Sequence, residues 1–243
     1  MHPILTVLAF AAFAAAAASL GVVLLVFRER PPIAWLGWSN ALAAGLMLGA
    51  AYLLLSSGGT MGAGPLAAGS LLGVGLVFAS HAVSGTADLD LNVLAGLGPA
   101  YVRKVIRVHT LHAAPEGVTI AVAMSLSPAL GVFMALAIAA HNVPEATVLA
   151  AMLMSRGASA ARAAAVAVMT NLGQILLATG TYALHLAWPA VLPWTLGFAA
   201  AALVYLVLAE LLPECYRQAG HTSVAVVTIL AMGMVALVGG GLS

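Results

Sequence analysis

Long apolar runs, broken by short polar clusters, are the feature that most restricts how this chain can fold. Of its 243 residues, 63% are hydrophobic and 6% are charged, and the mean hydropathy is +1.12. Soluble globular domains carry roughly 25% charged residues, so the composition excludes a water-soluble globule. A bilayer offers no water to backbone groups, which favours helices of about 20 apolar residues that satisfy their own hydrogen bonds. We therefore predict an all-α, polytopic membrane protein.

Eight segments of the sequence are long and apolar enough to cross a membrane. Clusters of Pro, Gly and Ser separate them, and the only long connection, residues 85–104, is too short for a soluble domain. We therefore expect residues 1–243 to form a single transmembrane domain. The predicted helices span residues 4–27, 34–55, 66–84, 105–127, 129–153, 162–184, 194–215 and 222–241.

The basic residues all fall on one side of such an eight-helix arrangement. They follow the first, third, fifth and seventh segments, as Arg28 and Arg156 do. Because basic loops stay in the cytoplasm, both termini are predicted to be extracytoplasmic, which requires an even number of crossings. The net charge of +1 and the lack of a basic stripe exclude a nucleic-acid-binding protein.

Two copies of the pattern His-x-x-Pro-Glu lie in the middle of the fourth and fifth segments. A carboxylate at the centre of a bilayer costs roughly 2.5 to 3.5 kcal/mol, so each copy requires an explanation. Residues four apart share one face of a helix, and the short connection between the segments predicts an antiparallel hairpin in which the two patterns meet. Two imidazoles and two carboxylates suit zinc and related divalent ions such as iron, cobalt, nickel or cadmium. The predicted ligands are His112, Glu116, His141 and Glu145.

The proline of each pattern adds to this prediction. Pro115 and Pro144 donate no backbone hydrogen bond, and each ring displaces the carbonyl group four residues earlier. Within a membrane, such broken backbone is tolerated where it is buried in protein or lines a wet cavity. The prolines therefore predict that a cavity and the metal ligands share one location.

These residues resemble the ZIP (Zrt/Irt-like) family of divalent-metal transporters. The stretches His112-Ala-Ala-Pro-Glu-Gly117 and His141-Asn-Val-Pro-Glu-Ala146 are similar to the fourth and fifth helices of that family. Residues 45–51 look like its second helix, and residues 203–214 look like its seventh. The resemblance covers essentially the whole chain and implies a ZIP-like bundle with both termini outside.

The resemblance also implies a function. It implies transport into the cytoplasm of a divalent transition metal, zinc foremost, with iron, manganese, cadmium and nickel as alternatives. No enzymatic activity and no cofactor other than the transported ion are expected. The implied setting is the lipid bilayer of a plasma membrane, which in a bacterium is the inner membrane, with a homodimer as the assembly. The first, fourth, fifth and sixth helices are implied to move against the other four.

Departures from the family pattern predict a weak second metal site. Relatives that hold two adjacent metals carry Asn after the first His, where this chain has Ala113, and a glutamate on the sixth helix, where it has Gln174. The second site is therefore expected to retain only Asn142 and Gln174 beside the primary ligands. The expected exit path toward the cytoplasm passes residues on either side of that site, namely His109, Glu210, Glu214 and His221.

Two other functions remain open from the sequence alone. An intramembrane zinc-dependent hydrolase would also bury histidines and carboxylates around a metal, although the chain has no His-Glu-x-x-His pattern. A metal sensor that binds without translocating would have the same ligands. Uptake by reconstituted vesicles separates the three functions.

Overall fold

The computed structural model describes residues 2–27, 32–59, 61–84 and 99–240. Every regular element in these ranges is helical, which confirms the all-α prediction. The elements are α1 (Pro3–Phe27), α2 (Ile33–Ser57), α3 (Ala63–Ser84), α4 (Pro99–Leu126), α5 (Pro128–Met154), α6 (Ala160–Thr170), α7 (Leu172–Ala187), η1 (Pro189–Val191), α8 (Leu192–Leu206), η2 (Val207–Leu211), α9 (Leu212–Ala219) and α10 (His221–Gly240).

The described helices cover all eight predicted segments. Seven stretches are long and apolar enough to cross a membrane, and α4 is an eighth long helix with a more polar sequence. The seven stretches are Pro3–Val23, Ile33–Ser57, Ala63–Ser80, Pro128–Met154, Ala160–Ala187, Pro189–Ala219 and His221–Gly239.

The predicted connection over residues 85–104 is wrong at its carboxyl end, because α4 already begins at Pro99. Proline suits the first turn of a helix, and the helix continues through the polar residues Arg103 and Lys104. Hydropathy locates only the apolar part of a helix, so it misses a polar turn outside that part. The rest of the predicted connection lies outside the described residues.

Two predicted spans are interrupted rather than continuous. The span over residues 162–184 divides at Asn171, whose φ of −87° and ψ of 6° leave the helical region and whose Nδ2 donates to Ala167 O at 2.9 Å. Asparagine side chains compete in this way with backbone hydrogen bonds. The span over residues 194–215 contains the π-helical turn η2 between α8 and α9.

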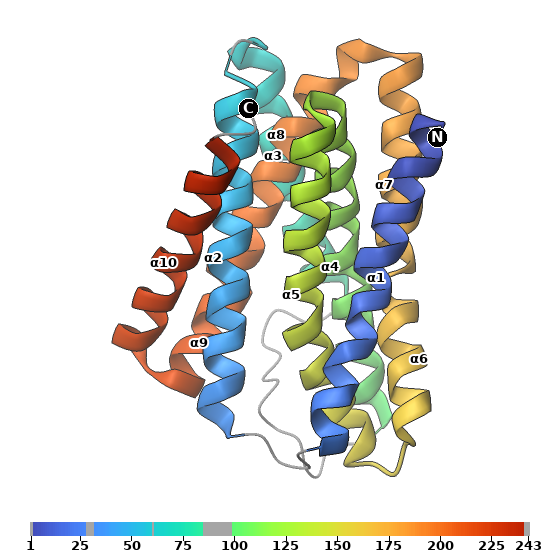
Figure 1. Ribbon diagram of the computed structural model, residues 1–243, viewed down its shortest axis with the longest axis vertical. Coiled ribbons are helices and arrows are strands. Elements are labelled where there is room, and N and C mark those ends of the chain that lie inside the picture. Colours follow the sequence, from blue (N-terminus) through green and yellow to red (C-terminus); the bar gives the residue numbers. More distant parts are fainter. Residues whose placement is uncertain (1, 28–31, 60, 85–98, 241–243) are drawn as a thin grey trace.

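The helices form two groups that meet along a shared interface. In one group, α1, α4, α5, α6 and α7 pack together, and in the other α2, α3, α8, α9 and α10 pack together. The groups meet where α2 packs on α5 and where α4 packs on α8. Figure 1 shows α2, α9 and α10 on one side of the bundle and α1, α6 and α7 on the other. This division coincides with the one that the family resemblance implies.

Glycine allows one of the closest helix crossings in the first group. A Cβ atom at Gly21 of α1 would lie 2.7 Å from the backbone nitrogen of Thr147 on α5. In return, Thr147 Oγ1 donates to Gly21 O at 3.2 Å. Any larger residue at this position would push α1 away from the helix that carries His141 and Glu145.

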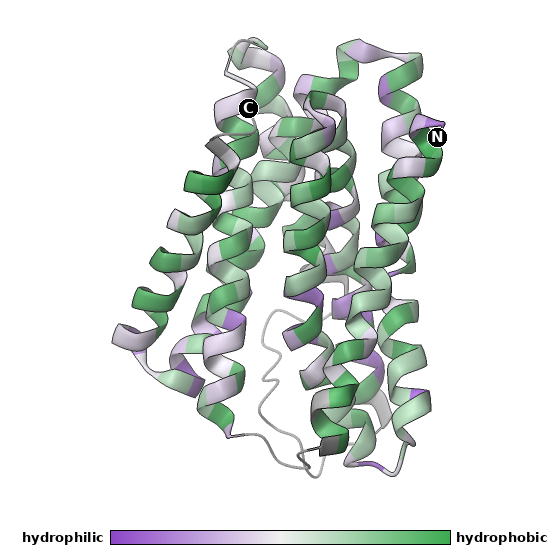
Figure 2. Ribbon diagram, viewed as in Figure 1, coloured by the Kyte–Doolittle hydropathy of each residue, from purple (hydrophilic) through white to green (hydrophobic). Residues whose placement is uncertain are grey.

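The outside of the bundle is apolar, and its polar residues are largely inside or at the ends (Figure 2). Large side chains such as Leu71, Phe78, Ile229 and Leu237 are exposed on α3 and α10, whereas Glu116 is buried. This inverts the arrangement of a soluble protein and suits a surrounding of lipid. Exposed tryptophans lie near the start of α2 and, at the opposite end, beside η1, as expected for membrane interfaces; they are Trp35, Trp38, Trp188 and Trp194.

The two ends of the chain point toward the same end of the bundle. Figure 1 shows the amino end of α1 and the carboxyl end of α10 directed toward the same end. The described basic residues lie on the first turns of α4, at the turn between α5 and α6, and on α9, toward the other end of the bundle. They are Arg103, Lys104, Arg107, Arg156, Arg162 and Arg217.

Candidate metal site

The helical hairpin formed by α4 and α5 places both His-x-x-Pro-Glu patterns near the middle of the bundle. The turn is set by Ser127, whose Oγ accepts from Leu130 N at 3.5 Å, and by Pro128 in the first turn of α5. These are common residues for the start of a helix. Both helices continue through their internal prolines, Pro115 and Pro144.

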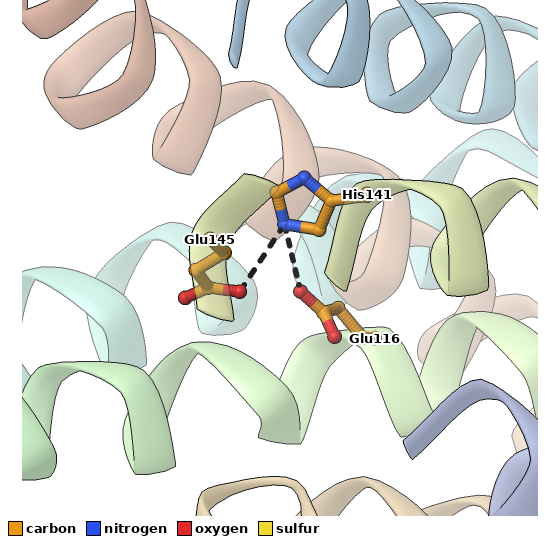
Figure 3. A group of neighbouring side chains, drawn as sticks. All are labelled: Glu116, His141 and Glu145. Atoms are coloured by element: carbon orange, nitrogen blue, oxygen red, sulfur yellow. Dashed lines mark ion pairs between the residues drawn. The ribbon is translucent and has the colours of Figure 1, made fainter. Parts of the chain in front are cut away.

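Three of the four predicted ligands converge on one point. Glu116, His141 and Glu145 each offer a ligand atom, and these atoms all lie within 4.8 Å of one another. His141 Nε2 is 3.3 Å from Glu116 Oε1 and 3.6 Å from Glu145 Oε2 (Figure 3). Bonds of about 2.0–2.2 Å to a tetrahedral zinc ion separate its ligands by about 3.3–3.6 Å. The separations from His141 therefore match a set that shares one ion.

Burial makes this group of charged side chains a candidate for binding a cation. Glu116 is 1% exposed, and within the described part of the chain neither of its carboxylate oxygens has a hydrogen bond. The same holds for Nδ1 of His141. A buried carboxylate whose oxygens accept no hydrogen bond is unfavourable, even with one imidazole nearby. A divalent ion between Glu116, His141 and Glu145 would supply the missing interactions.

His112 lies beside this group rather than inside it. Its Nδ1 is 3.7 Å from Glu145 Oε1, and its Nε2 is 2.6 Å from Oε2 of Glu210. His109 approaches the same side of Glu145, with Nε2 3.9 Å from Oε1. Glu145 thus faces His141 with one carboxylate oxygen and His109 and His112 with the other.

A cavity of about 70 Å³ adjoins the site and has room for a few waters or an ion. Its polar lining includes residues of both helix groups, namely Asn40, His109, His112, His141, Glu145, Glu210 and Glu214. Glu214 also pairs with Arg217 and accepts from Gln218 Nε2 at 2.6 Å. Three of the four residues predicted for the exit path therefore line one cavity together with His112, His141 and Glu145.

His221, the fourth predicted exit residue, has a different position. It begins α10, is exposed, and its ring lies against that of Tyr216 with the centroids 4.7 Å apart. It is not among the residues that line the cavity.

The sequence prediction includes Glu210 but not the π turn that carries it, and it does not include Asn40. Glu210 lies in the π turn η2, which widens the helix next to His112, and π turns are frequent at functional sites. Asn40 of α2 lines the cavity although most of that helix is apolar. A lone amide within an apolar helix is a signal that the sequence does offer, whereas nothing local marks the π turn.

The residues predicted for a weak second site contact each other and hold α1. Asn142 Nδ2 donates to Gln174 Oε1 at 3.2 Å and to Ala14 O at 2.9 Å. Gln174 Nε2 donates to Ala11 O at 3.3 Å. Asn142 Oδ1 has no hydrogen bond in the described part of the chain. The amides therefore connect α1, α5 and α7.

Comparison with known proteins gives two relatives. A protein of Arabidopsis thaliana whose name describes it as a candidate zinc transporter is 33% identical over 237 residues, 96% of this chain and 38% of that protein. The zinc transporter GufA of Myxococcus xanthus is 43% identical over 110 residues, 44% of this chain and 43% of that protein. The matched part of the chain thus spans about two fifths of the length of each relative. No protein-family model matches the chain.

Proposed function

The chain belongs to the ZIP family, and on that premise we propose that it transports a divalent transition-metal ion across a membrane, with zinc as the first choice. Iron, manganese, cadmium and nickel are the alternative ions. The observation that carries the proposal is the buried group of Glu116, His141 and Glu145, whose atoms are spaced for one ion and include carboxylate oxygens without hydrogen bonds. Nitrogen and oxygen ligands of this kind suit zinc and its neighbours rather than calcium or magnesium.

Each residue has a separate role in this proposal. Glu116, His141 and Glu145 hold the ion, and His112 joins them as the fourth ligand from the far side of Glu145. The ion leaves through the adjoining cavity, past Glu210 and the other acidic and histidine side chains that line it. Asn142 and Gln174 offer at most a weak second position, because Gln174 Oε1 already accepts from Asn142 Nδ2 and both amide nitrogens donate to α1.

The direction and setting are part of the same proposal. The basic end of the bundle is cytoplasmic, both termini are extracytoplasmic, and the ion moves into the cytoplasm of a cell whose plasma membrane, the inner membrane in a bacterium, holds the protein. A homodimer is the proposed assembly, and a mass measurement of the protein in detergent tests it.

Uptake of metal by liposomes that contain the purified protein tests the function. The wild type is expected to take up Zn²⁺, and the variants Glu116→Gln and His141→Ala are expected to lose uptake. Thr179→Val is the matched control, because Thr179 Oγ1 donates only to Ile175 O of its own helix, at 2.9 Å. Uptake by the two site variants at the wild-type rate would refute the site.

The same preparation distinguishes the other two functions. Zinc binding without uptake would identify a sensor, and zinc-dependent hydrolysis of lipid or peptide would identify an intramembrane hydrolase. Transport is preferred to both alternatives because the names of both relatives describe zinc transporters.

A further inference from the structure

A second cavity, of about 310 Å³, lies at the basic end of the bundle, between the first turns of α4, the end of α5 and the start of α6. It lies nearer the basic end of α4 and α5 than the metal ligands do, and it shares no lining residue with the cavity beside them. Four apolar side chains and two arginines line it, namely Val102, Ile106, Leu153, Val166, Arg156 and Arg162. It therefore combines an apolar wall with two positive charges.

The turn between α5 and α6 brings Arg156 and Arg162 to the same cavity. α5 ends at Met154, Gly157 takes a φ of +84°, and α6 begins after Ser159, whose Oγ accepts from Arg162 N at 3.3 Å. Arg156 Nη1 donates to Met152 O at 3.1 Å, which holds its guanidinium against the end of α5. α6 begins at this turn, so the positive end of its helix dipole adds to the positive charge of the arginines there.

The apolar wall determines the class of ligand. Val102 and Ile106 lie one turn apart on α4, Leu153 is in the last turn of α5, and Val166 is in the second turn of α6. Figure 1 shows that the α5–α6 turn lies at the end of the bundle, and the ends of membrane-spanning helices face the lipid head groups. A free anion would use the arginines and leave the apolar wall unused, whereas a lipid has both a charged head and an acyl chain.

We propose that this cavity binds an anionic phospholipid, with its phosphate on Arg156 and Arg162 and an acyl chain along the wall formed by Val102, Ile106, Leu153 and Val166. Guanidinium groups pair well with phosphate oxygens. Basic pockets between membrane helices are suited to anionic lipid head groups. The proposal is independent of metal transport, since binding is measured without metal.

The test is native mass spectrometry of the full chain in mild detergent with added phosphatidylglycerol or phosphatidylcholine. The wild type is expected to retain phosphatidylglycerol selectively. The variant Arg156→Gln/Arg162→Gln is expected to bind it about tenfold or more weakly. The control Arg103→Gln/Lys104→Gln removes the same charge from exposed positions at the same end of the bundle, outside the cavity lining, and is expected to bind as the wild type does.

A third variant and three specific outcomes complete the test of lipid binding. Ala158→Leu narrows the cavity while keeping both arginines, and it is expected to weaken phosphatidylglycerol binding even if the arginine variant fails to fold. Equal loss in the Arg103→Gln/Lys104→Gln control would show that only general surface charge attracts the lipid and would overturn the proposal. It would also be overturned if phosphatidylcholine bound equally well, or if inorganic phosphate displaced phosphatidylglycerol at equal concentration.

Discussion

At the scale of single residues, Glu116 and Glu145 show how two similar carboxylates take different positions. Glu116 is enclosed and contacts His141, while Glu145 lies between His141 on one side and His109 and His112 on the other. The charge of Glu145 is therefore compensated in part by neighbouring imidazoles. Glu116 has one imidazole beside it, whereas Glu145 has three.

Replacement of Glu116 by glutamine is expected to have opposite effects with and without metal. The change keeps the volume of the side chain but removes a buried charge, so the metal-free protein should unfold at a higher temperature than the wild type. Zinc affinity should fall by about 100-fold or more, since loss of a residue that only hydrogen-bonds to a metal ligand already costs about 10–100-fold. Thermal unfolding in chelator and calorimetric zinc titration measure the two effects. A variant that kept the wild-type shift in unfolding temperature on zinc addition would contradict the role of Glu116.

The sequence could predict contacts between residues of the same helix. It could not predict contacts between residues that belong to different helix groups. The i,i+4 spacing of His141 and Glu145 places them on one face of α5, and His141 Nε2 does lie 3.6 Å from Glu145 Oε2. His112 has the same spacing, yet it contacts Glu210, because that contact depends on a π turn and on packing between distant segments. The break at Asn171 was likewise invisible to hydropathy, which averages over a single polar residue.

At the scale of elements, the π turn η2 presents Glu210 to His112 across the interface between the two helix groups. Glu210→Gln is expected to lower zinc affinity by about tenfold, less than Glu116→Gln does, because Glu210 contacts the proposed ligand His112 but is outside the group of Glu116, His141 and Glu145. It should slow uptake by about tenfold, the rate effect of roughly 1.4 kcal/mol, because the departing ion loses a carboxylate. Parallel measurement of zinc binding and of uptake into liposomes separates these effects. A loss of affinity as large as that in Glu116→Gln would instead place Glu210 among the primary ligands.

A hydrogen-bonded chain joins the two groups near the end opposite the basic residues. His185 Nδ1 lies 2.7 Å from Ser125 Oγ, and its Nε2 lies 2.7 Å from Thr195 Oγ1, so the ring connects α7 with α4 and α8. Ser125 and Thr195 also donate to backbone carbonyls, at 2.9 Å to Ala121 O and 3.0 Å to Leu192 O. Both hydroxyl groups would therefore keep a partner if the ring were lost.

His185→Phe is expected to lower the free energy of unfolding by about 1–3 kcal/mol, the net value of two hydrogen bonds. Zinc affinity should be unchanged, because His185 does not line the cavity at the metal site. Chemical denaturation in detergent and calorimetry provide the two measurements, with Thr179→Val as the control that removes a hydroxyl from the same helix. If His185→Phe unfolded at the same denaturant concentration as the wild type, the hydrogen bonds of His185 to Ser125 and Thr195 would not contribute to stability.

At the scale of the whole molecule, the charges and the apolar surface define an orientation in the membrane. The described basic residues gather toward one end, the buried carboxylates lie between the helix groups, and the large exposed side chains are apolar. The interface between the groups is rich in small buried residues such as Ala123 of α4 and Ala199 of α8. Such surfaces allow helices to approach closely, so the same packing that closes the bundle can accommodate relative movement of its two groups.

The orientation can be tested with single cysteines at opposite ends of the bundle. Ser159 lies exposed in the turn between α5 and α6, and Ala190 lies exposed beyond the far end of α7. The native Cys215 is fully buried, so it should react little. A membrane-impermeant maleimide added to intact cells is expected to label Ala190→Cys but not Ser159→Cys, because the basic end faces the cytoplasm. Lysed cells, in which both positions should react, provide the control. Labelling of Ser159→Cys and protection of Ala190→Cys in intact cells would reverse the orientation and, with it, the proposed direction of uptake.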